Sequence, residues 1–293
     1  MATEQIAAPA QLERKPLDEE IDVYGLTHAG KTRPDNQDHF LICALRKQMV
    51  VQQTSLPFPE RLGGGPERLA FLAMVADGVG GGAKGEEASR VALEEVTQYV
   101  SGTMRCYYAT GAVDDTEFTR SLQEAALQSS AELHRRGEED PEFQGMATTL
   151  TLYLGVWPKA YLLQVGDSRC YVFRNGELRQ LTRDQTMAQE LVDLGVLKAA
   201  EAAATRLART LSSAIGGRMT DPVVTPLNMS WGTVVLLCSD GLTAHVPDER
   251  IRERLRAMTS AKQACEDLLR DALDAGGTDN VTIIVGRALR KAD

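Results

Sequence analysis

Short apolar runs with strand character follow one another along this chain, and this pattern restricts its possible folds more than any other feature. Three such runs, 148–155 (TTLTLYLG), 160–166 (AYLLQVG) and 169–174 (RCYVFR), succeed each other with only brief turns between them. The Asn175-Gly176 pair after the third run is typical of a tight hairpin. Strands in hairpins, rather than strands that alternate with helices, indicate antiparallel sheets.

Helical periodicity is confined to separate blocks. Apolar residues recur at helical spacing between Ala88 and Val100, a second amphipathic helix is predicted over 115–136, and the composition of 184–211 favours short helices. The remaining strands are predicted at 21–27 (IDVYGLT), 38–45 (DHFLICAL), 69–76 (LAFLAMVA), 233–238 (TVVLLC) and 280–286 (NVTIIVG). We therefore expect an α+β fold with antiparallel sheets and helices packed outside them.

The length of the chain suits one domain. Its 293 residues, 43% of them hydrophobic, can bury one sizeable core. Residues 1–20 combine prolines and mixed charge without periodicity, so we expect a flexible N-terminal tail. The domain itself is expected over 21–290, with a surface insertion at 46–68 where prolines and glycines accumulate.

Charge and cysteine usage exclude some classes of protein. The chain carries 32 Lys and Arg against 41 Asp and Glu, a net charge of −9 that argues against nucleic acid as the main partner. No apolar run approaches the roughly 20 residues of a membrane span, and the polar N-terminus does not resemble a signal peptide. The five cysteines are scattered and predict reduced core residues, so we expect a cytoplasmic protein without a membrane partner.

Two glycine patterns suggest nucleotide binding, but their context is wrong. Residues 25–32 (GLTHAGKT) match a phosphate loop, yet Pro34 and the polar residues around it offer no helix to hold a phosphate. Gly80, Gly82 and Gly85 match a dinucleotide fingerprint, but the hairpin-rich remainder does not suit a parallel sheet. A nucleotide-binding protein is therefore the weakest of the hypotheses.

Aspartates stand at the ends of several predicted strands. Asp77 follows FLAMVA, Asp240 follows VVLLCS, Asp279 precedes NVTIIV and Asp167 follows LLQVG. Any one of them alone is best interpreted as the cap of a turn. Together, on neighbouring strands, they would repel one another unless protonated or neutralised by cations, and hard divalent ions prefer such oxygen ligands. The sequence thus favours a metal site.

The motifs around these aspartates carry a family resemblance. The series RPDNQD, VADGVGGGAKGEEAS, GMATTLT, VGDSRCYVFRNGELRQLTRDQT, LLCSDGLT and GGTDNVTIIV resembles the ordered motifs of the metal-dependent serine/threonine protein phosphatases, the type 2C or PPM family, in their bacterial form. The resemblance extends over about 22–287. It implies an α-β-β-α sandwich of two antiparallel sheets flanked by helices, with a flap over the site at 184–206.

The resemblance also implies roles for individual residues. Asp77 would bridge two Mn²⁺ or Mg²⁺ ions, the Gly78 carbonyl would contact one of them, and Asp240 and Asp279 would hold the other. Asp167, with Asp240, matches the position of a third ion in bacterial members. Arg33 matches the arginine that grips the substrate phosphate. The residues in supporting positions around the ligands are Asn36, Gln37, Asp38 and Asn280.

The implied activity is hydrolysis of phosphoserine and phosphothreonine in proteins by a metal-activated water. The partners would be phosphorylated proteins, the targets of a serine/threonine kinase. The alternative is a catalytically weak pseudo-phosphatase that acts as a binding module. Gln37 replaces a frequent Glu, Val79 replaces the histidine of eukaryotic members, and Ala147 replaces a usual glycine, but none of these changes removes a direct ligand.

Overall fold

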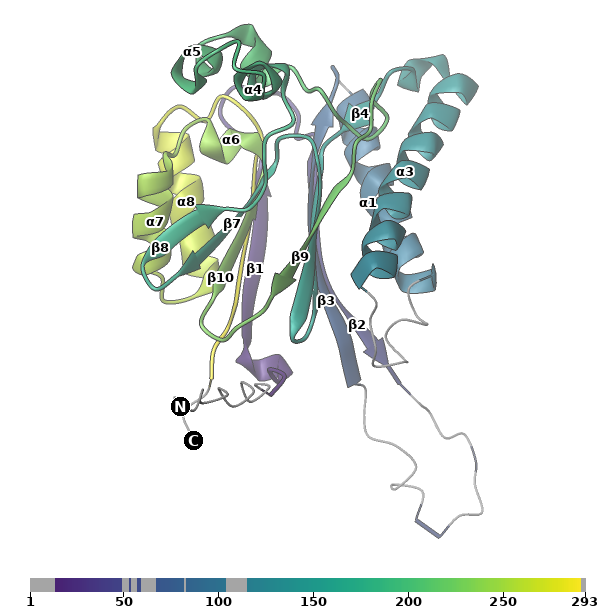
Figure 1. Cartoon of the computed structure of the whole chain (residues 1–293), viewed down its shortest axis with the longest axis vertical. Coiled ribbons are helices and arrows are strands. Elements are labelled where there is room, and N and C mark those ends of the chain that lie inside the picture. The colour runs from purple at the N-terminus through teal and green to yellow at the C-terminus, as the bar shows by residue number, and fades with distance from the viewer. Residues whose placement is uncertain are drawn as a thin grey trace, which may run out of the picture.

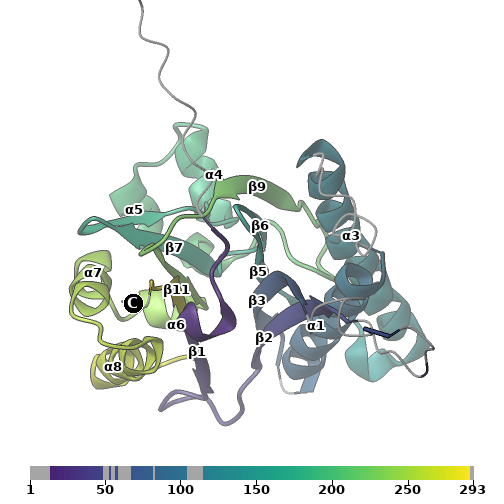
Figure 2. The same cartoon turned by 90° about the horizontal axis from the view of Figure 1, so that it is seen from below.

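The computed structural model describes residues 14–48, 53, 57–58, 67–81, 83–103 and 115–290. Two antiparallel sheets stand face to face at its centre, and helices cover the outer face of each (Figure 1). Figure 2 shows the same four layers from below, with α1 and α3 on one side and α7 and α8 on the other. The expected α-β-β-α sandwich is therefore confirmed.

Every strand pair in the two sheets is antiparallel. The five-stranded sheet has the order β1-β11-β10-β7-β8, and the six-stranded sheet has the order β2-β3-β5-β6-β9 with β4 paired to β3. The strands are β1 (Ile21–His28), β2 (Asp38–Lys47), β3 (Glu67–Val79), β4 (Ala147–Thr148), β5 (Leu150–Val156), β6 (Lys159–Val165), β7 (Arg169–Arg174), β8 (Glu177–Gln180), β9 (Val223–Asn228), β10 (Val234–Cys238) and β11 (Val281–Ala288). The predicted Asn175-Gly176 hairpin joins β7 to β8, with both residues at positive φ (51° and 84°).

Long helices cover the sheets and short ones lie at one end. The helices are α1 (Ala83–Thr103), α3 (Asp115–Glu139), α4 (Met187–Asp193), α5 (Ala199–Ala203), α6 (Asp240–Thr243), α7 (Asp248–Arg256) and α8 (Ala261–Asp274), with 3-10 turns η1 (Asp18–Glu20), η3 (Pro141–Phe143) and η4 (Arg206–Arg209). The segments α4, α5 and η4 contain the short helices predicted for 184–211. In Figure 1, α4 and α5 lie at the top of the molecule, above α6. None of the helices in the described ranges has the length and apolar character needed to cross a bilayer.

Three apolar layers hold the sandwich together, because side chains on each strand alternate between its two faces. One layer joins α1 and α3 to the six-stranded sheet, and a second joins α7 and α8 to the five-stranded sheet. The layer between the sheets includes Ala73, Val75, Cys170 and Leu237. Cys43, Cys170, Cys238 and Cys265 are free thiols, as expected, while Cys106 lies outside the described residues.

Several elements were not expected from the sequence. The strand β9 contains Pro226, which is tolerated because β9 lies at the edge of its sheet. The helices α6, α7 and α8 follow the last but one strand and were not predicted. Their omission leaves the outer face of the five-stranded sheet without a cover.

Residues 14–20, part of the expected N-terminal tail, contact the domain. Glu20 is 4% exposed and accepts hydrogen bonds from Arg14, and Asp18 forms ion pairs with Arg46 and Arg68. These ion pairs tie the segment to the ends of β2 and β3, so only residues 1–13, which lie outside the described residues, remain a predicted tail. Most of the expected 46–68 insertion also lies outside them.

Candidate metal centre

Acidic side chains from both sheets gather at one end of the sandwich. Asp77, near the end of β3, pairs in register with Asp38, the first residue of β2. Asp240 begins α6 after β10, and Asp279 lies just before β11. Asp167 lies in the turn between β6 and β7. We call these five residues the acidic cluster.

The carboxylates of the acidic cluster act on one another. Burial raises the pKa of Asp77 well above its ordinary value, and the other four carboxylates of the acidic cluster raise it further. Burial, followed by the negative charge of Asp240, raises the pKa of Asp167 to about 8. Burial and the charge of Asp279 raise the pKa of Asp240, although a hydrogen bond with Asp77 opposes this shift. The acidic cluster therefore disfavours ionisation of its carboxyl groups, and a bound cation would reduce the repulsion between the carboxylates.

Asp38 is the most deeply buried member of the acidic cluster, at 3% exposed. Its Oδ2 accepts hydrogen bonds from Ser239 Oγ at 2.8 Å and Thr282 Oγ1 at 2.7 Å. Burial nevertheless raises the pKa of Asp38 to about 7. Its Oδ1 is buried without a hydrogen-bond partner among the described residues. Such an orphaned oxygen calls for a proton, a water or a cation.

Arg33 lies beside the acidic cluster, in the loop between β1 and β2. Its Nη2 donates a hydrogen bond to Asp279 Oδ2 at 2.8 Å, and about half of the Arg33 side chain is exposed. This bond, together with the charges of Asp77 and Asp240, raises the pKa of the guanidinium, so Arg33 stays charged. A fixed, exposed cation beside a carboxylate cluster is suited to receive a phosphate oxygen.

Asn280 anchors the loop that carries Arg33. Its Nδ2 donates to the Ala29 and Asp35 carbonyls at 3.0 and 2.9 Å, and its Oδ1 accepts from the Gln37 amide at 2.9 Å. Because Asn280 is 5% exposed, these three bonds are shielded from water. Asn36 adds a bond from its Nδ2 to Thr27 Oγ1 at 2.9 Å. Asn280 and Asn36 thus fix the backbone of the β1–β2 loop, while the Arg33 side chain remains partly exposed to solvent.

The backbone around Asp77 is held on both sides. Thr149 Oγ1 accepts from the Asp77 amide at 3.0 Å, and Thr148 Oγ1 donates to the Asp77 carbonyl at 2.9 Å. The Gly78 amide donates to the Gln37 carbonyl at 3.2 Å. A Cβ at Gly78 would lie 2.1 Å from the Gly85 carbonyl oxygen, so only glycine fits there.

The turn of Asp167 is tied to the segment predicted as a flap. The Gly166 amide donates to Gln185 Oε1 at 2.7 Å, and Arg169 forms a two-pronged ion pair with Asp184. Further along, in η4, the positive charge of Arg209 lowers the pKa of Asp240. Neither Arg209 nor the Arg169–Asp184 pair was expected from the sequence, because each depends on how the flap packs against the strands.

The donor chemistry of the site fits divalent ions, although its side chains are not arranged as a finished cage. The acidic cluster offers only oxygen donors, which Mg²⁺ and Mn²⁺ prefer. Within the described ranges, no three His, Cys, Asp or Glu side chains already have the arrangement of a metal-binding group. One reason is that Arg33 occupies Oδ2 of Asp279. Binding of a metal ion by this oxygen would require Arg33 to release it or to share it.

Comparisons with known proteins identify the family that the sequence motifs resemble. The family model described as "Protein phosphatase 2C" matches residues 64–275. The serine/threonine protein phosphatase PstP of Mycobacterium tuberculosis is 36% identical over 220 residues, which is 74% of this chain and 40% of that protein. The serine/threonine phosphatase stp of Listeria monocytogenes is 30% identical over 217 residues, 73% of this chain and 83% of that protein. The chain thus spans about 40% of the length of PstP.

Solved structures agree with the fold. The crystal structure of the M. tuberculosis phosphatase PstP/Ppp has a TM-score of 0.74 at 28% identity, covering 92% of this chain and 99% of that one. The catalytic domain of PstP in complex with two manganese ions has a TM-score of 0.70 at 28% identity, with the same coverage of both chains.

Proposed function

The chain belongs to the protein phosphatase 2C family, and from this premise we propose that it hydrolyses phosphoserine and phosphothreonine in proteins with the help of divalent ions. The observation that carries the proposal is the gathering of Asp77, Asp240 and Asp279 beside the exposed cation of Arg33. When bound, a pair of Mn²⁺ or Mg²⁺ ions lowers the pKa of a shared water and offsets charge on the phosphoryl oxygens.

In this proposal each residue of the chain has a separate task. Asp77 and the Gly78 carbonyl, on β3, would hold the ions from the six-stranded sheet, and Asp240 and Asp279, beside β10 and β11, would hold them from the side of the five-stranded sheet. Asp167, close enough to Asp240 for its pKa to respond to that carboxylate, would supply a ligand for a third ion. The solved PstP catalytic domain, with its two manganese ions, supports two ions rather than one.

Arg33 orients the phosphate group. Its guanidinium lies at the cluster yet remains half exposed, so an incoming phosphate can take up its free N–H groups without displacing buried structure. The Asn280 bonds hold the loop in place during this exchange. Orientation of this kind turns binding energy into rate, because the phosphoryl group is presented in one direction only.

The substrates in this proposal are phosphorylated proteins, the products of a serine/threonine kinase. The segment 184–206 would act as a flap beside the site, since Gln185 is bonded to the Asp167 turn. The free thiols of the described cysteines support action in a reducing compartment such as the cytoplasm.

A catalytically weak pseudo-phosphatase remains the second candidate, and the Arg33–Asp279 ion pair favours it, because this bond occupies an oxygen that a metal ion would need. A single experiment separates the two functions. The purified chain is incubated with a phosphothreonine peptide under a chelator, and then with Mn²⁺ or Mg²⁺. Release of phosphate only after metal addition, and its loss in Asp240→Asn, supports the enzyme. Metal-independent binding of the peptide without turnover supports the binding module.

A further inference from the structure

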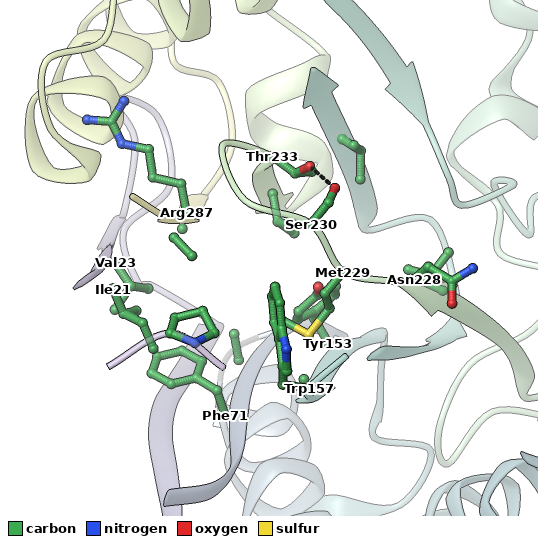
Figure 3. Close-up of a pocket in the computed structure, with 18 of the residues that line it drawn as sticks. Ile21, Val23, Phe71, Tyr153, Trp157, Asn228, Met229, Ser230, Thr233 and Arg287 are labelled. Atoms are coloured by element: carbon green, nitrogen blue, oxygen red, sulfur yellow. Dashed lines mark hydrogen bonds between the residues drawn. The ribbon is translucent and has the colours of Figure 1, made fainter. Parts of the chain in front are cut away.

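A cavity of about 550 Å³ lies between the two sheets, at the end opposite the acidic cluster (Figure 3). It is lined by residues of β3, which carries Asp77, and of β10 and β11, which adjoin Asp240 and Asp279. Phe71 stands on β3 before Asp77, Val235 on β10 before Asp240, and Ile284 on β11 after Asp279. The cavity is therefore separate from the proposed catalytic site.

Small residues and the spread of the sheets open this cavity. Gly155 on β5 and Gly286 on β11 contribute no side chain, and Ala73 contributes only a methyl group. Figure 3 shows Ile21, Val23, Phe71, Tyr153, Trp157 and Met229 around a central open space. The walls are thus predominantly apolar, and the volume lies within the range of about 300–1,000 Å³ that is usual for small-molecule sites.

Cations surround the opening of the cavity. Arg174 and Arg179 are exposed, line the cavity from the β7–β8 hairpin, and have no ion pair among the described residues. The one acidic side chain in the lining is Glu177, which stands opposite Arg174 in the register. Lys15, half-buried at the same opening, has its pKa lowered by burial and by the charge of Arg68.

Other cations of the lining are already engaged. Arg68 pairs with Asp18, and Arg287 pairs with Asp22 at 3.0 Å, with its guanidinium turned away from the open space in Figure 3. Lys15 Nζ donates one hydrogen bond to the Arg68 carbonyl and keeps further N–H donors, so Lys15, Arg174 and Arg179 have capacity for an added negative group. An anion at the opening would stabilise all three ammonium and guanidinium charges.

We propose that this cavity is a binding site for a small amphiphile with one carboxylate, such as a medium-chain fatty acid. Its apolar chain lies between the sheets, and its carboxylate lies at the opening beside Lys15, Arg174 and Arg179. Each CH₂ group that leaves water strengthens binding by about fourfold. The affinity therefore rises with chain length until the cavity is filled, and a neutral head group binds more weakly than a carboxylate.

The position of the two tryptophans makes this site measurable. Trp157 lines the cavity, and the ring of Trp231 lies 5.9 Å from that of Trp157. The chain has no further tryptophan. Intrinsic fluorescence of the full, metal-loaded chain thus reports on this end of the molecule alone. The probe is sodium dodecanoate, titrated below its micelle concentration and checked by calorimetry, with hexanoate and dodecanol as the short and the uncharged comparison.

Two variants and one control test the geometry. The double change Arg174→Glu and Arg179→Glu should weaken dodecanoate binding at least tenfold and dodecanol binding far less. Gly286→Leu should abolish binding of both by filling the cavity, since a Cβ there would lie no closer than 3.4 Å to its neighbours. Arg120→Glu, on exposed α3 outside the other sheet, should bind as the unaltered chain does.

The outcomes are distinct. Saturable dodecanoate binding that depends on the two arginines supports the proposal. No saturable binding to the full chain overturns it. Equal dodecanoate affinity in the charge-reversed variant overturns it as well, and this variant changes only exposed side chains, so it does not depend on Gly286→Leu folding. Because the readout needs no phosphorylated substrate, it is independent of phosphatase activity.

Discussion

Arg33 and Asp279 are joined by a hydrogen bond of 2.8 Å between Nη2 and Oδ2, across 246 positions of the chain. The bond connects the β1–β2 loop to the segment just before β11, and it joins the proposed phosphate-binding cation to a proposed metal ligand. We therefore expect phosphate and metal ions to compete with this bond, because a phosphate would need the Arg33 guanidinium and a metal ion would need the Asp279 carboxylate.

The first prediction follows from that contact. Arg33→Ala should lower kcat/KM for a phosphothreonine peptide by about 10- to 100-fold, because a charge-assisted hydrogen bond contributes about 1.5–3 kcal/mol. The control is Lys31→Ala, which removes an exposed cation from the same loop. Steady-state kinetics are measured on both variants. Equal losses of kcat/KM in the two would show that Arg33 does not bind the phosphate.

A second prediction concerns the crowding of carboxylates. Asp240→Asn should abolish metal-dependent turnover, yet it should raise the melting temperature of the metal-free chain, because one repelling buried charge is gone. The same variant should lose most of the thermal stabilisation that Mn²⁺ gives the unaltered chain. Asp274→Asn, exposed at the end of α8, serves as the matched control. A metal-induced shift that survives in Asp240→Asn would contradict the proposed ligand role.

The third prediction is a pH dependence of stability. In the folded chain the pKa of Asp38 is about 7 and that of Asp167 about 8, both above their ordinary value of 3.8. Between the ordinary pKa and the raised pKa of each carboxyl, the folded state binds more protons than the unfolded state. The free energy of unfolding therefore falls as pH rises from about 4 to about 8. The slope is at most about 1.4 kcal/mol per pH unit for each carboxyl.

Urea unfolding in the presence of a chelator, at pH 5 and at pH 8, measures this effect. Added Mn²⁺ should reduce or reverse the dependence, because cations favour the ionised carboxylates. Stability that rises with pH in the metal-free chain would mean that the cluster is not crowded.

A fourth prediction addresses the loop anchor. Asn280→Ala removes three shielded hydrogen bonds and should lower the free energy of unfolding by about 1–3 kcal/mol. It should also reduce kcat/KM, because the loop that carries Arg33 loses its fixed position. Denaturant unfolding and kinetics are measured on the same preparation. Full activity in a destabilised variant would show that the anchor serves stability alone.

The proposed flap gives a fifth prediction. Leu194 and Val196, within this segment, are 76% and 64% exposed and offer an apolar surface to a protein substrate. Changing both to serine should lower kcat/KM for a phosphoprotein while leaving hydrolysis of a small aryl phosphate nearly unchanged, because only the protein is large enough to reach this surface. Equal effects on the two substrates would rule out a role in substrate choice.

Local patterns in the sequence predicted those elements whose signals are local. The strands β3, β5 and β6 follow from apolar runs, the β7–β8 hairpin follows from Asn175-Gly176, and α1 follows from periodic alanines and valines. The edge strand β9 escaped because Pro226 reads as a strand breaker, although an edge position permits it. Segment 14–20 escaped because its order comes from ion pairs with Arg46 and Arg68, which are remote in sequence.

The site was predictable in part for the same reason. Each aspartate could be placed at a strand end, but whether those ends meet depends on strand order, which the family resemblance supplied and the residues alone did not. The contact of Arg33 with Asp279, the charge of Arg209 near Asp240 and the orphaned Asp38 oxygen arise only in the folded chain. The cavity between the sheets has no local signal, because its lining comes from strands of both sheets that are far apart in sequence.

β3 runs from the cavity at Phe71 to the carboxylate of Asp77, a span of about 20 Å at the usual rise of a strand. In the opposite sheet, β10 and β11 also line the cavity, and β10 ends two residues before Asp240 while β11 begins two residues after Asp279. Paired strands are stiff, so these three strands connect the two ends of the sandwich mechanically. A bound molecule that increases the angle between the sheets at the cavity would therefore change the distances between the aspartates of the acidic cluster.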